Sequence, residues 1–330
     1  MADIEGRSPD LLTARRIQSP SAVVGVDGGG TKTDAVVMDP SGRVLGEGAA
    51  GPSNPLRVGV NNAAVAIREA IDLACAAAQL RRADIIAAEI GLAGVRRRDI
   101  RDRMEDALAG LGIGELEVIR DADIALFGAT DGQPGVVVIA GTGSVCCGMN
   151  AQGRRACAGG WGPIIGDEGG GSWVARRALR AVSHAADGRG PETSLTAAAR
   201  SYFHVTNPDD LSTAIYAPTM TNERLAGFGK QVIVAAKEKD KVAREIMTEA
   251  GKELGVAVAA VIHNLRMERE RFPVAYVGGV FAAGELVLDE LRRQIQRVAP
   301  RAYLALPRFT PVVAAARLAR EHVNHVALAV

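Results

Sequence analysis

The chain has 330 residues, of which 48% are hydrophobic and 23% charged, and its 39 basic and 38 acidic side chains leave a net charge of +1. A chain this long and apolar can bury a substantial core, which excludes global disorder, and its length is typical of about two domains. The balanced charge provides no overall field to attract nucleic acid or an anionic membrane, so we expect neither as a partner.

The sequence carries no sign of a membrane or secretory segment. No run of about 18 apolar residues occurs, and residues 1–20 are charged and lack the apolar stretch of a signal peptide. Four cysteines do not make a disulfide framework in a chain of this length. We therefore expect a cytoplasmic protein in which residues 1–20 form a mobile tail.

Strands and helices alternate in the first part of the chain. Apolar runs bounded by turn residues predict strands at 22–26, 33–39, 43–48, 85–92 and 116–119. Helical spacing of apolar residues predicts helices at 61–80 and 98–108, and a further helix begins near residue 122. The first two strands flank a glycine-rich turn at 27–31.

The opening pattern recurs from residue 136. Strands are expected at 136–140, 145–149 and 154–158, with a glycine-rich turn at 141–144 between the first two. Such an internal repeat indicates a duplicated domain. The remainder is mainly helical, with strands expected at 274–277 and 302–305 and helices at 172–186, 192–203, 223–237, 240–266, 284–297 and 312–326.

The first glycine-rich turn has the residues of an anion-binding loop. Glycines there let backbone N–H groups approach a phosphate without interference from a Cβ atom. The candidate nucleotide ligands in this turn are Asp27, Gly28, Gly29, Gly30, Thr31, Lys32 and Thr33. Asp27, at the end of a buried strand, is suited to hold Mg²⁺ through its water shell. An ordinary glycine hairpin is the alternative, and neither a Walker A motif nor a GxGxxG turn opening a helix is present.

Two further glycine motifs have the same property. The candidates in the turn of the second copy are Gly141, Thr142, Gly143 and Ser144. A triphosphate that bridges two lobes needs one such cradle on each side. Gly278 and Gly279 follow a strand and could let an adenosine lie against the backbone. Each motif alone is also compatible with a plain turn.

Asp121 is the candidate catalytic residue. It follows the strand at 116–119, and the C-terminal ends of strands are where sites form in α/β sheets. A helix begins directly after it, so a helix N-cap is the alternative, and Asp123 competes for either role.

The segment 159–172 is half glycine and carries one tryptophan and two acidic residues. Trp161, beside Gly160, offers a flat apolar face to a sugar ring, and Asp167 offers acceptors for neighbouring hydroxyls. A loop that only leads into the helix at Ser172 is the alternative.

In this linear order the motifs resemble the sugar kinase/Hsp70/actin superfamily, and within it the BadF/BadG-type ATPases and the N-acetylglucosamine kinases. The resemblance covers about residues 22–320. It rests on the motifs DGGGTKTD (27–34), GPSN (51–54), GLAG (91–94), DAD (121–123), GTGS (141–144), GGWGPIIGDEGGG (159–171) and VGGVF (277–281). The chain departs from the N-acetylglucosamine kinases at Ala93-Gly94, where a serine-rich turn is common, and at Pro311–Ala315, where a glycine is common.

The resemblance implies two ribonuclease H-like, actin-like ATPase lobes with a central nucleotide cleft. Residues 21–132 and 311–330 would form one lobe and residues 133–310 the other. It further implies an ATP- and Mg²⁺-dependent kinase that phosphorylates the 6-hydroxyl of N-acetyl-D-glucosamine, with Asp121 as the general base, and it favours a homodimer. The implied sugar-binding residues are Asn54, Gly94, Asp121, Gly160, Trp161 and Asp167.

Two other functions stay open at this point. One is a kinase for another amino sugar, glucosamine or N-acetylmuramate. The other is an activator ATPase that drives electrons into a partner enzyme. Such activators bind an iron–sulfur cluster through cysteines, and this chain lacks a matching cysteine loop. A non-catalytic ATP-gated module, as in actin or chaperones, would have no use for the segment 159–171.

Overall fold

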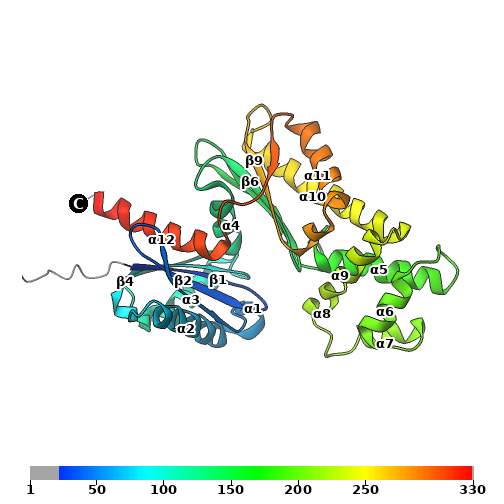
Figure 1. The fold of residues 1–330 in the computed structure, drawn as a ribbon, viewed down its shortest axis with the longest axis horizontal. Coiled ribbons are helices and arrows are strands. Elements are labelled where there is room, and N and C mark those ends of the chain that lie inside the picture. Colours follow the sequence, from blue (N-terminus) through cyan, green and yellow to red (C-terminus); the bar gives the residue numbers. More distant parts are fainter. Residues whose placement is uncertain (1–21, 329–330) are drawn as a thin grey trace, which may run out of the picture.

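The computed structural model describes residues 22–328, which form two α/β lobes (Figure 1). Each lobe contains a five-stranded sheet, and the strand orders are β3-β2-β1-β4-β5 and β10-β9-β6-β7-β8. Read from its other edge, the second order is β8-β7-β6-β9-β10, so the two sheets share one topology. The duplication predicted from the two glycine turns is therefore a duplication of the fold.

The first lobe places an antiparallel meander beside two parallel strands. Its strands are β1 (Ala22–Gly28), β2 (Thr33–Met38), β3 (Val44–Ala50), β4 (Ile85–Leu92) and β5 (Glu115–Arg120). β1 pairs antiparallel with β2 and parallel with β4, so it lies at the centre of the sheet. The helices are α1 (Pro55–Val58), α2 (Val60–Ala77), α3 (Arg98–Leu108) and α4 (Asp121–Thr130), with short 3-10 helices η1 (Arg82–Asp84) and η2 (Ala109–Leu111).

The second lobe repeats this sheet and adds a larger set of helices. Its strands are β6 (Gly135–Ala140), β7 (Ser144–Met149), β8 (Arg155–Gly159), β9 (Pro273–Val277) and β10 (Tyr303–Ala305). β6 is central, antiparallel to β7 and parallel to β9. Its helical segments are α5 (Gly171–Ala186), α6 (Leu195–Phe203), η3 (Pro208–Asp210), α7 (Leu211–Ile215), α8 (Asn222–Gly227), α9 (Gly229–Lys237), α10 (Lys241–Leu265), η4 (Gly279–Ala283) and α11 (Glu285–Val298).

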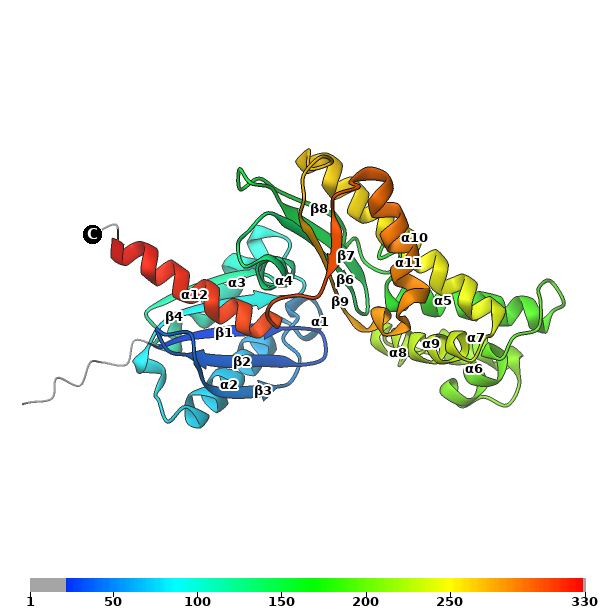
Figure 2. The same ribbon diagram turned by 45° about the horizontal axis from the view of Figure 1, so that its top comes forward.

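The last helix, α12 (Pro311–Leu328), returns to the first sheet and lies across it (Figure 2). A glycine in β1 makes this close packing possible. A Cβ atom on Gly25 would lie 2.0 Å from the backbone nitrogen of Ala316 and 2.6 Å from the carbonyl oxygen of Val312. Because no side chain fits in that space, the helix backbone rests directly on the strand.

Helix α4 lies between the two sheets and packs against both. Eight of its ten residues are buried, as expected of a helix that is apolar on all sides. Leu126 belongs to a buried cluster with Val137 of the second sheet. On the other side, Ile124 fills the space above Gly91, where a Cβ atom would lie 2.4 Å from its Cδ1. This packing holds Asp121, the first residue of α4, at the junction of the lobes.

Most of the predicted elements agree with the structure to within a few residues. β4 and α3 span the predicted ranges 85–92 and 98–108. The helix predicted at 223–237 is instead two helices, α8 and α9, which meet at the fully buried Phe228. Within residues 22–328, no helix is both long and apolar enough to span a membrane. The predicted mobile tail, residues 1–20, lies outside the described residues.

Candidate functional site

The first glycine turn, between β1 and β2, is joined to two neighbouring loops by backbone hydrogen bonds. The Gly29 carbonyl accepts from the N–H groups of Ser53 and Asn54 at 3.0 and 3.1 Å. The Gly28 carbonyl accepts from the Ala93 N–H at 2.9 Å. Three motifs from distant parts of the sequence therefore form one edge of the first sheet.

Two polar side chains of this turn already have partners. Thr33 is fully buried, and its Oγ1 lies 2.6 Å from the carbonyl oxygen of Gly51 and 2.8 Å from Oγ of Ser53. The exposed ammonium group of Lys32 lies 2.6 Å from the carboxylate of Asp34. The Thr33 hydroxyl thus supports the turn from within, whereas Lys32 must leave Asp34 to reach a ligand.

Asn54 and Gly94 lie against each other. The Oδ1 atom of Asn54 accepts from the Leu56 N–H at 3.0 Å and caps α1. Gly94 has a φ of 84°, and a Cβ atom on it would lie 2.3 Å from Asn54 Oδ1. The glycine is therefore required both by its backbone conformation and by the neighbouring amide.

Asp27 and Asp121 are partly buried carboxylates at the same edge of the first sheet. Burial, and secondarily the charge of Asp121, raise the pKa of Asp27 to about 6. Burial likewise raises the pKa of Asp121 to about 6. Two partly buried carboxylates that repel each other are stabilised when a cation binds beside them.

The structure distinguishes Asp121 from its rival Asp123. Arg120 binds Asp123 through two nitrogens, at 2.8 and 2.7 Å, and Arg155 lies 3.5 Å from the same carboxylate. Asp121 accepts a hydrogen bond from the Ala122 N–H at 2.8 Å and pairs with no basic side chain of residues 22–328. The N-cap position belongs to Arg120, so Asp121 is not the cap of α4.

The second glycine turn, between β6 and β7, supports the N-terminus of α5. The N–H of Gly171 donates to the carbonyl of Gly141 at 2.8 Å, and the N–H of Ser172 donates to the carbonyl of Thr142 at 2.9 Å. Since a helix N-terminus carries partial positive charge, this arrangement favours an anion near the turn.

Both turns have free backbone donors. In the described part of the chain, the N–H groups of Gly30 and Thr31 in the first turn donate to no other backbone group. The same holds for Thr142 and Gly143 in the second turn. Free N–H groups in glycine-rich turns are suited to bind phosphate oxygens.

Asp167 is buried under the second turn. Its Oδ1 accepts from the Gly162 N–H at 3.2 Å, and a Cβ atom on Gly143 would lie 2.2 Å from its Oδ2. The Oγ of Ser144 donates to the Glu168 carbonyl at 2.7 Å, which fixes the adjoining backbone. Burial raises the pKa of Asp167. The predicted phosphate turn and the predicted sugar segment are thus one packed unit.

Trp161 lies at the surface of this segment, with 62% of the residue exposed. The guanidinium of Arg96, which follows β4 in the first lobe, is stacked over the indole ring, and its Nη1 donates to the Gly160 carbonyl at 3.5 Å. Sequence reasoning did not identify Arg96. The contact joins the two lobes, and no local sequence pattern encodes it.

A second contact between the lobes lies beside the first turn. Arg57 of α1 forms an ion pair with Glu223 of α8. A Cβ atom on Gly30 would lie 3.0 Å from Nη1 of Arg57, so this ion pair adjoins the glycine turn. Neither residue was predicted from the sequence: Arg57 lies three positions after Asn54, but its partner Glu223 comes from the other lobe, so the pair forms only in the folded chain.

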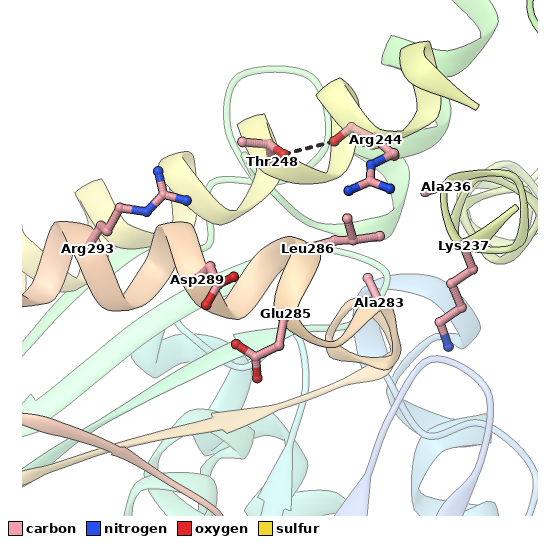
Figure 3. Close-up of a pocket in the computed structure, with 9 residues that line it drawn as sticks. All are labelled: Ala236, Lys237, Arg244, Thr248, Ala283, Glu285, Leu286, Asp289 and Arg293. Atoms are coloured by element: carbon pink, nitrogen blue, oxygen red, sulfur yellow. Dashed lines mark hydrogen bonds between the residues drawn. The ribbon is translucent and has the colours of Figure 1, made fainter. Parts of the chain in front are cut away.

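The Gly278-Gly279 motif lies beside the second turn and leads to a cavity. Gly278 has a φ of 119°, and a Cβ atom on it would lie 2.3 Å from the Ala140 carbonyl oxygen. η4 begins at Gly279 and ends at Ala283, which lines a cavity of about 480 Å³ (Figure 3). The residues around this cavity are Ala236, Lys237, Arg244, Thr248, Ala283, Glu285, Leu286, Asp289 and Arg293.

One disulfide was not anticipated from the sequence. Cys147 and Cys157 are directly opposite in the pairing of β7 and β8, and a disulfide joins them. Cys75 and Cys146 are free and buried. A single bridge is not a disulfide framework, but it was not predicted, since its two partners lie ten positions apart and are brought together only by the strand register.

Comparison with known proteins identifies the family. Residues 24–319 match the sequence model of the BadF/BadG/BcrA/BcrD ATPase family. The chain belongs to this family. The match includes both glycine turns, Asp121 and the segment 159–171.

Two relatives of the chain are named as amino-sugar kinases. The N-acetylmuramic acid/N-acetylglucosamine kinase of Clostridium acetobutylicum is 34% identical over 272 residues, covering 82% of this chain and 89% of that protein. The N-acetyl-D-glucosamine kinase of Dictyostelium discoideum is 31% identical over 314 residues, covering 91% of this chain and 98% of that protein.

A solved structure from Chromobacterium violaceum, provisionally assigned as an N-acetylglucosamine kinase, has the same fold. It superposes with a TM-score of 0.76 at 28% identity, covering 91% of this chain and 99% of that one. This likeness and the repeated sheets confirm the predicted fold class, two lobes of the actin-like ATPase type.

Proposed function

We propose that this chain is an ATP-dependent kinase of amino sugars and that it phosphorylates the 6-hydroxyl of N-acetyl-D-glucosamine. The observation that carries the proposal is the environment of Asp121. This carboxylate is partly buried, has no basic partner among the described residues, and lies close enough to Asp27 to raise its pKa. Membership of the ATPase family and the names of the two relatives support it.

The phosphates of ATP would bind between the two glycine turns. The free N–H groups of Gly30 and Thr31 on one side and of Thr142 and Gly143 on the other support this assignment. The N-terminus of α5, held against the second turn, would add favourable electrostatic potential. The carbonyl groups of Gly28 and Gly29 keep the first turn in place.

The residues of this edge fit a magnesium ion. Asp27 is a partly buried carboxylate whose pKa is raised by burial and by the charge of Asp121, so a divalent cation there would be stabilised. Asp27 would hold the ion directly or through water. Bound Mg²⁺ supplies positive charge against the oxygens of the transferred phosphate.

The adenosine would lie on the side of the second lobe where Gly278 and Gly279 leave the sheet. The exposed backbone of these glycines and the cavity that adjoins η4 support this position. Ala236, Ala283 and Leu286 offer apolar surface, and the other residues of the lining are polar or charged. An aromatic base needs such surface on at least one face.

The sugar would bind between the Asn54 loop and the segment 159–171. Asn54 Nδ2 has no hydrogen-bond partner among the described residues, so the amide is free to donate to a hydroxyl or an acetyl oxygen. Gly94 and Gly160 would allow close approach, and Asp167 would accept from hydroxyls. Trp161 offers an apolar face to the ring.

Asp121 would accept the proton of the 6-hydroxyl as that oxygen attacks the γ-phosphate. The raised pKa of Asp121 makes it a better proton acceptor than an ordinary aspartate. A positioned general base contributes about 10²- to 10⁴-fold to rate. Alignment of the two substrates and the backbone donors of the turns would contribute the rest.

The alternatives differ in what they require of the site. A glucosamine or N-acetylmuramate kinase would use the same catalytic groups, and one relative is named for N-acetylmuramic acid as well. An activator ATPase needs cysteines free to bind an iron–sulfur cluster. In this chain Cys147 and Cys157 are bonded, and Cys75 and Cys146 are buried, which argues against that function.

A sugar panel tests the proposal. Purified protein with Mg²⁺ and ATP is assayed for ADP release with N-acetylglucosamine, glucosamine, N-acetylmuramate and glucose, and NMR locates the phosphate on the product. We expect the highest kcat/KM for N-acetylglucosamine and phosphate on the 6-oxygen. No ADP release with any amino sugar would overturn the proposal.

Size-exclusion chromatography with light scattering checks the predicted homodimer, and cell fractionation checks the predicted cytoplasmic location.

A further inference from the structure

A cluster of two carboxylates and one imidazole lies on the first lobe, on the face of the sheet that α12 covers. Glu89 of β4, Glu117 of β5 and His322 of α12 each present a ligand atom, and these atoms lie within 4.8 Å of one another. His322 Nδ1 is 3.2 Å from Glu89 Oε2 and 3.7 Å from Glu117 Oε2. The parallel register of β4 and β5 sets Glu89 directly opposite Glu117, so the sheet fixes the spacing of the two carboxylates.

One of the two carboxylate oxygens of Glu89 is buried without a partner in the described chain. Its side chain is 1% exposed, and within residues 22–328 its Oε1 has no hydrogen-bond partner. The nearby carboxylates of Glu117 and Asp123 add repulsion to the effect of burial, and together they raise the pKa of Glu89 to about 8 against the weaker, opposite influence of Arg155. A buried acidic group with these neighbours is stabilised by a cation.

The cluster is open to ions from solvent. It lines a cavity of about 300 Å³, and the side chains of Glu89, Glu117 and His322 all contribute to the walls. Glu117 and His322 are 57% and 45% exposed, so both can adjust to a ligand while Glu89 stays fixed in the strand.

We propose that Glu89, Glu117 and His322 bind a divalent transition-metal ion of the Zn²⁺ type. In a tetrahedral zinc site with ligands at about 2.0 Å, the ligand atoms lie roughly 3.3 Å apart, close to the spacing around His322 Nδ1. The imidazole nitrogen favours Zn²⁺, Co²⁺ or Ni²⁺ over Mg²⁺, which prefers oxygen ligands. Solvent would occupy the fourth position.

The ion would fasten the last helix to the first sheet. α12 packs closely on β1, with Ala316 against Gly25, and valines of the helix join the apolar cluster beneath it. A metal bridge from His322 to Glu89 would add a link between distant parts of the chain and so stabilise the folded lobe. The site does not include Asp27 or Asp121, and the inference stands independently of the kinase proposal.

Metal titration of the full-length, untagged protein tests this site. After removal of metals with a chelator, Co²⁺ or Zn²⁺ is titrated by calorimetry in the presence of excess Mg²⁺, which occupies weak oxygen sites. We expect one ion per chain, a visible Co²⁺ absorption typical of four-coordinate geometry, and a higher melting temperature with Zn²⁺. His322→Ala and Glu89→Gln should each weaken binding at least about 10-fold.

The matched control is Glu115→Gln, which alters a carboxylate in the lining of the same cavity that lies outside the cluster. This variant should bind the ion like the wild type. The inference is overturned if the wild-type protein takes up no ion, if His322→Ala binds as tightly as the wild type, or if Glu115→Gln loses as much affinity as Glu89→Gln. His322 is partly exposed, so its replacement by alanine leaves the fold intact and the test informative.

Discussion

The guanidinium of Arg96 lies 4.4 Å from the centroid of the Trp161 ring, and the two residues belong to different lobes. Both are exposed, so the stacked pair is a weak contact, of about 0.5–1 kcal/mol. A contact of this strength forms when the lobes approach and breaks when they part. It lies on the segment that we propose binds the sugar, so it can hold that segment closed without preventing product release.

Replacing Arg96 by alanine should weaken sugar binding and leave chemistry nearly unchanged. We expect the KM for N-acetylglucosamine to rise about 2- to 5-fold, with kcat and the KM for ATP close to wild type. Steady-state kinetics with each substrate varied in turn measures this. Arg97→Ala is the control, since Arg97 pairs with Asp99 at the surface and should have no effect. An unchanged sugar KM in the Arg96 variant would show that the stacked pair has no part in binding.

Replacing Asp121 by asparagine should remove catalysis while the protein stays folded. We expect kcat to fall at least about 10²-fold with ATP affinity retained. The folded-state pKa of about 6 exceeds the ordinary 3.8, so the ionised carboxylate at pH 7 destabilises the fold, and a neutral asparagine should cost no stability there. Single-turnover kinetics and calorimetry with ATP measure the two effects.

Asp123→Asn is the matched control for this experiment. Asp123 binds Arg120 and Arg155, so its loss should lower the melting temperature and reduce kcat less than about 10-fold. If the Asp123 variant lost as much turnover as the Asp121 variant, or if the Asp121 variant kept wild-type turnover, Asp121 would not be the base.

The fold could be predicted largely because its patterns are local. β4 and α3 match their predicted ranges because their apolar spacing is uninterrupted and turn residues bound them. The duplication was visible because both copies keep a glycine turn at the same strand end. The break between α8 and α9 was not predicted, because the apolar spacing of 223–237 continues across Phe228, although Gly227 and Gly229 flank that residue and weaken the helix there.

The site could be predicted only in part because its polar partners come from distant segments. The choice between Asp121 and Asp123 depends on which of the two carboxylates Arg120 binds, and on Arg155, which lies 32 positions from Asp123 and on the other lobe. Arg96 is one of three consecutive arginines, and nothing in the sequence separates it from Arg97. Candidate residues within the glycine turns and at strand ends could be proposed from local motifs. The residues whose contacts join the two lobes could not be proposed in this way.

Activity should fall on the acid side of a pH profile. A general base must be ionised, and the pKa of Asp121 is raised to about 6 by burial, so kcat/KM for the sugar should decline as pH drops below that value. Asp27 has a similar raised pKa and interacts with Asp121, so the decline reports the pair. In Asp121→Asn the decline should move to lower pH, because Asp27 loses the charge of Asp121, which helps to raise its pKa. A wild-type profile that is flat from about pH 5 to about pH 7.5 would contradict the assignment.

Replacing Thr142 by valine should weaken nucleotide binding more than sugar binding. The carbonyl of Thr142 holds the N–H of Ser172, and that bond survives the exchange, so only the hydroxyl is lost. We expect ATP affinity to fall about 10- to 150-fold, as for one lost hydrogen bond to a charged group, which contributes about 1.5–3 kcal/mol. Calorimetry with ATP and with sugar, each alone, measures both. Equal loss for the two ligands, or loss for the sugar only, would contradict the phosphate role of the second turn.

Replacing Gly94 by alanine should damage both the fold of the first lobe and the sugar site. The φ of 84° disfavours any side chain, and the new Cβ atom would lie 2.3 Å from Asn54 Oδ1, so the amide must move. We expect a loss of roughly 1–3 kcal/mol in the free energy of unfolding and a sugar KM raised about 10-fold. Chemical denaturation and kinetics measure these effects. Gly110→Ala is the control, since a Cβ atom there meets no neighbour and should leave both values near wild type. If Gly94→Ala lowered stability but kept the sugar KM, Asn54 would not be a sugar ligand.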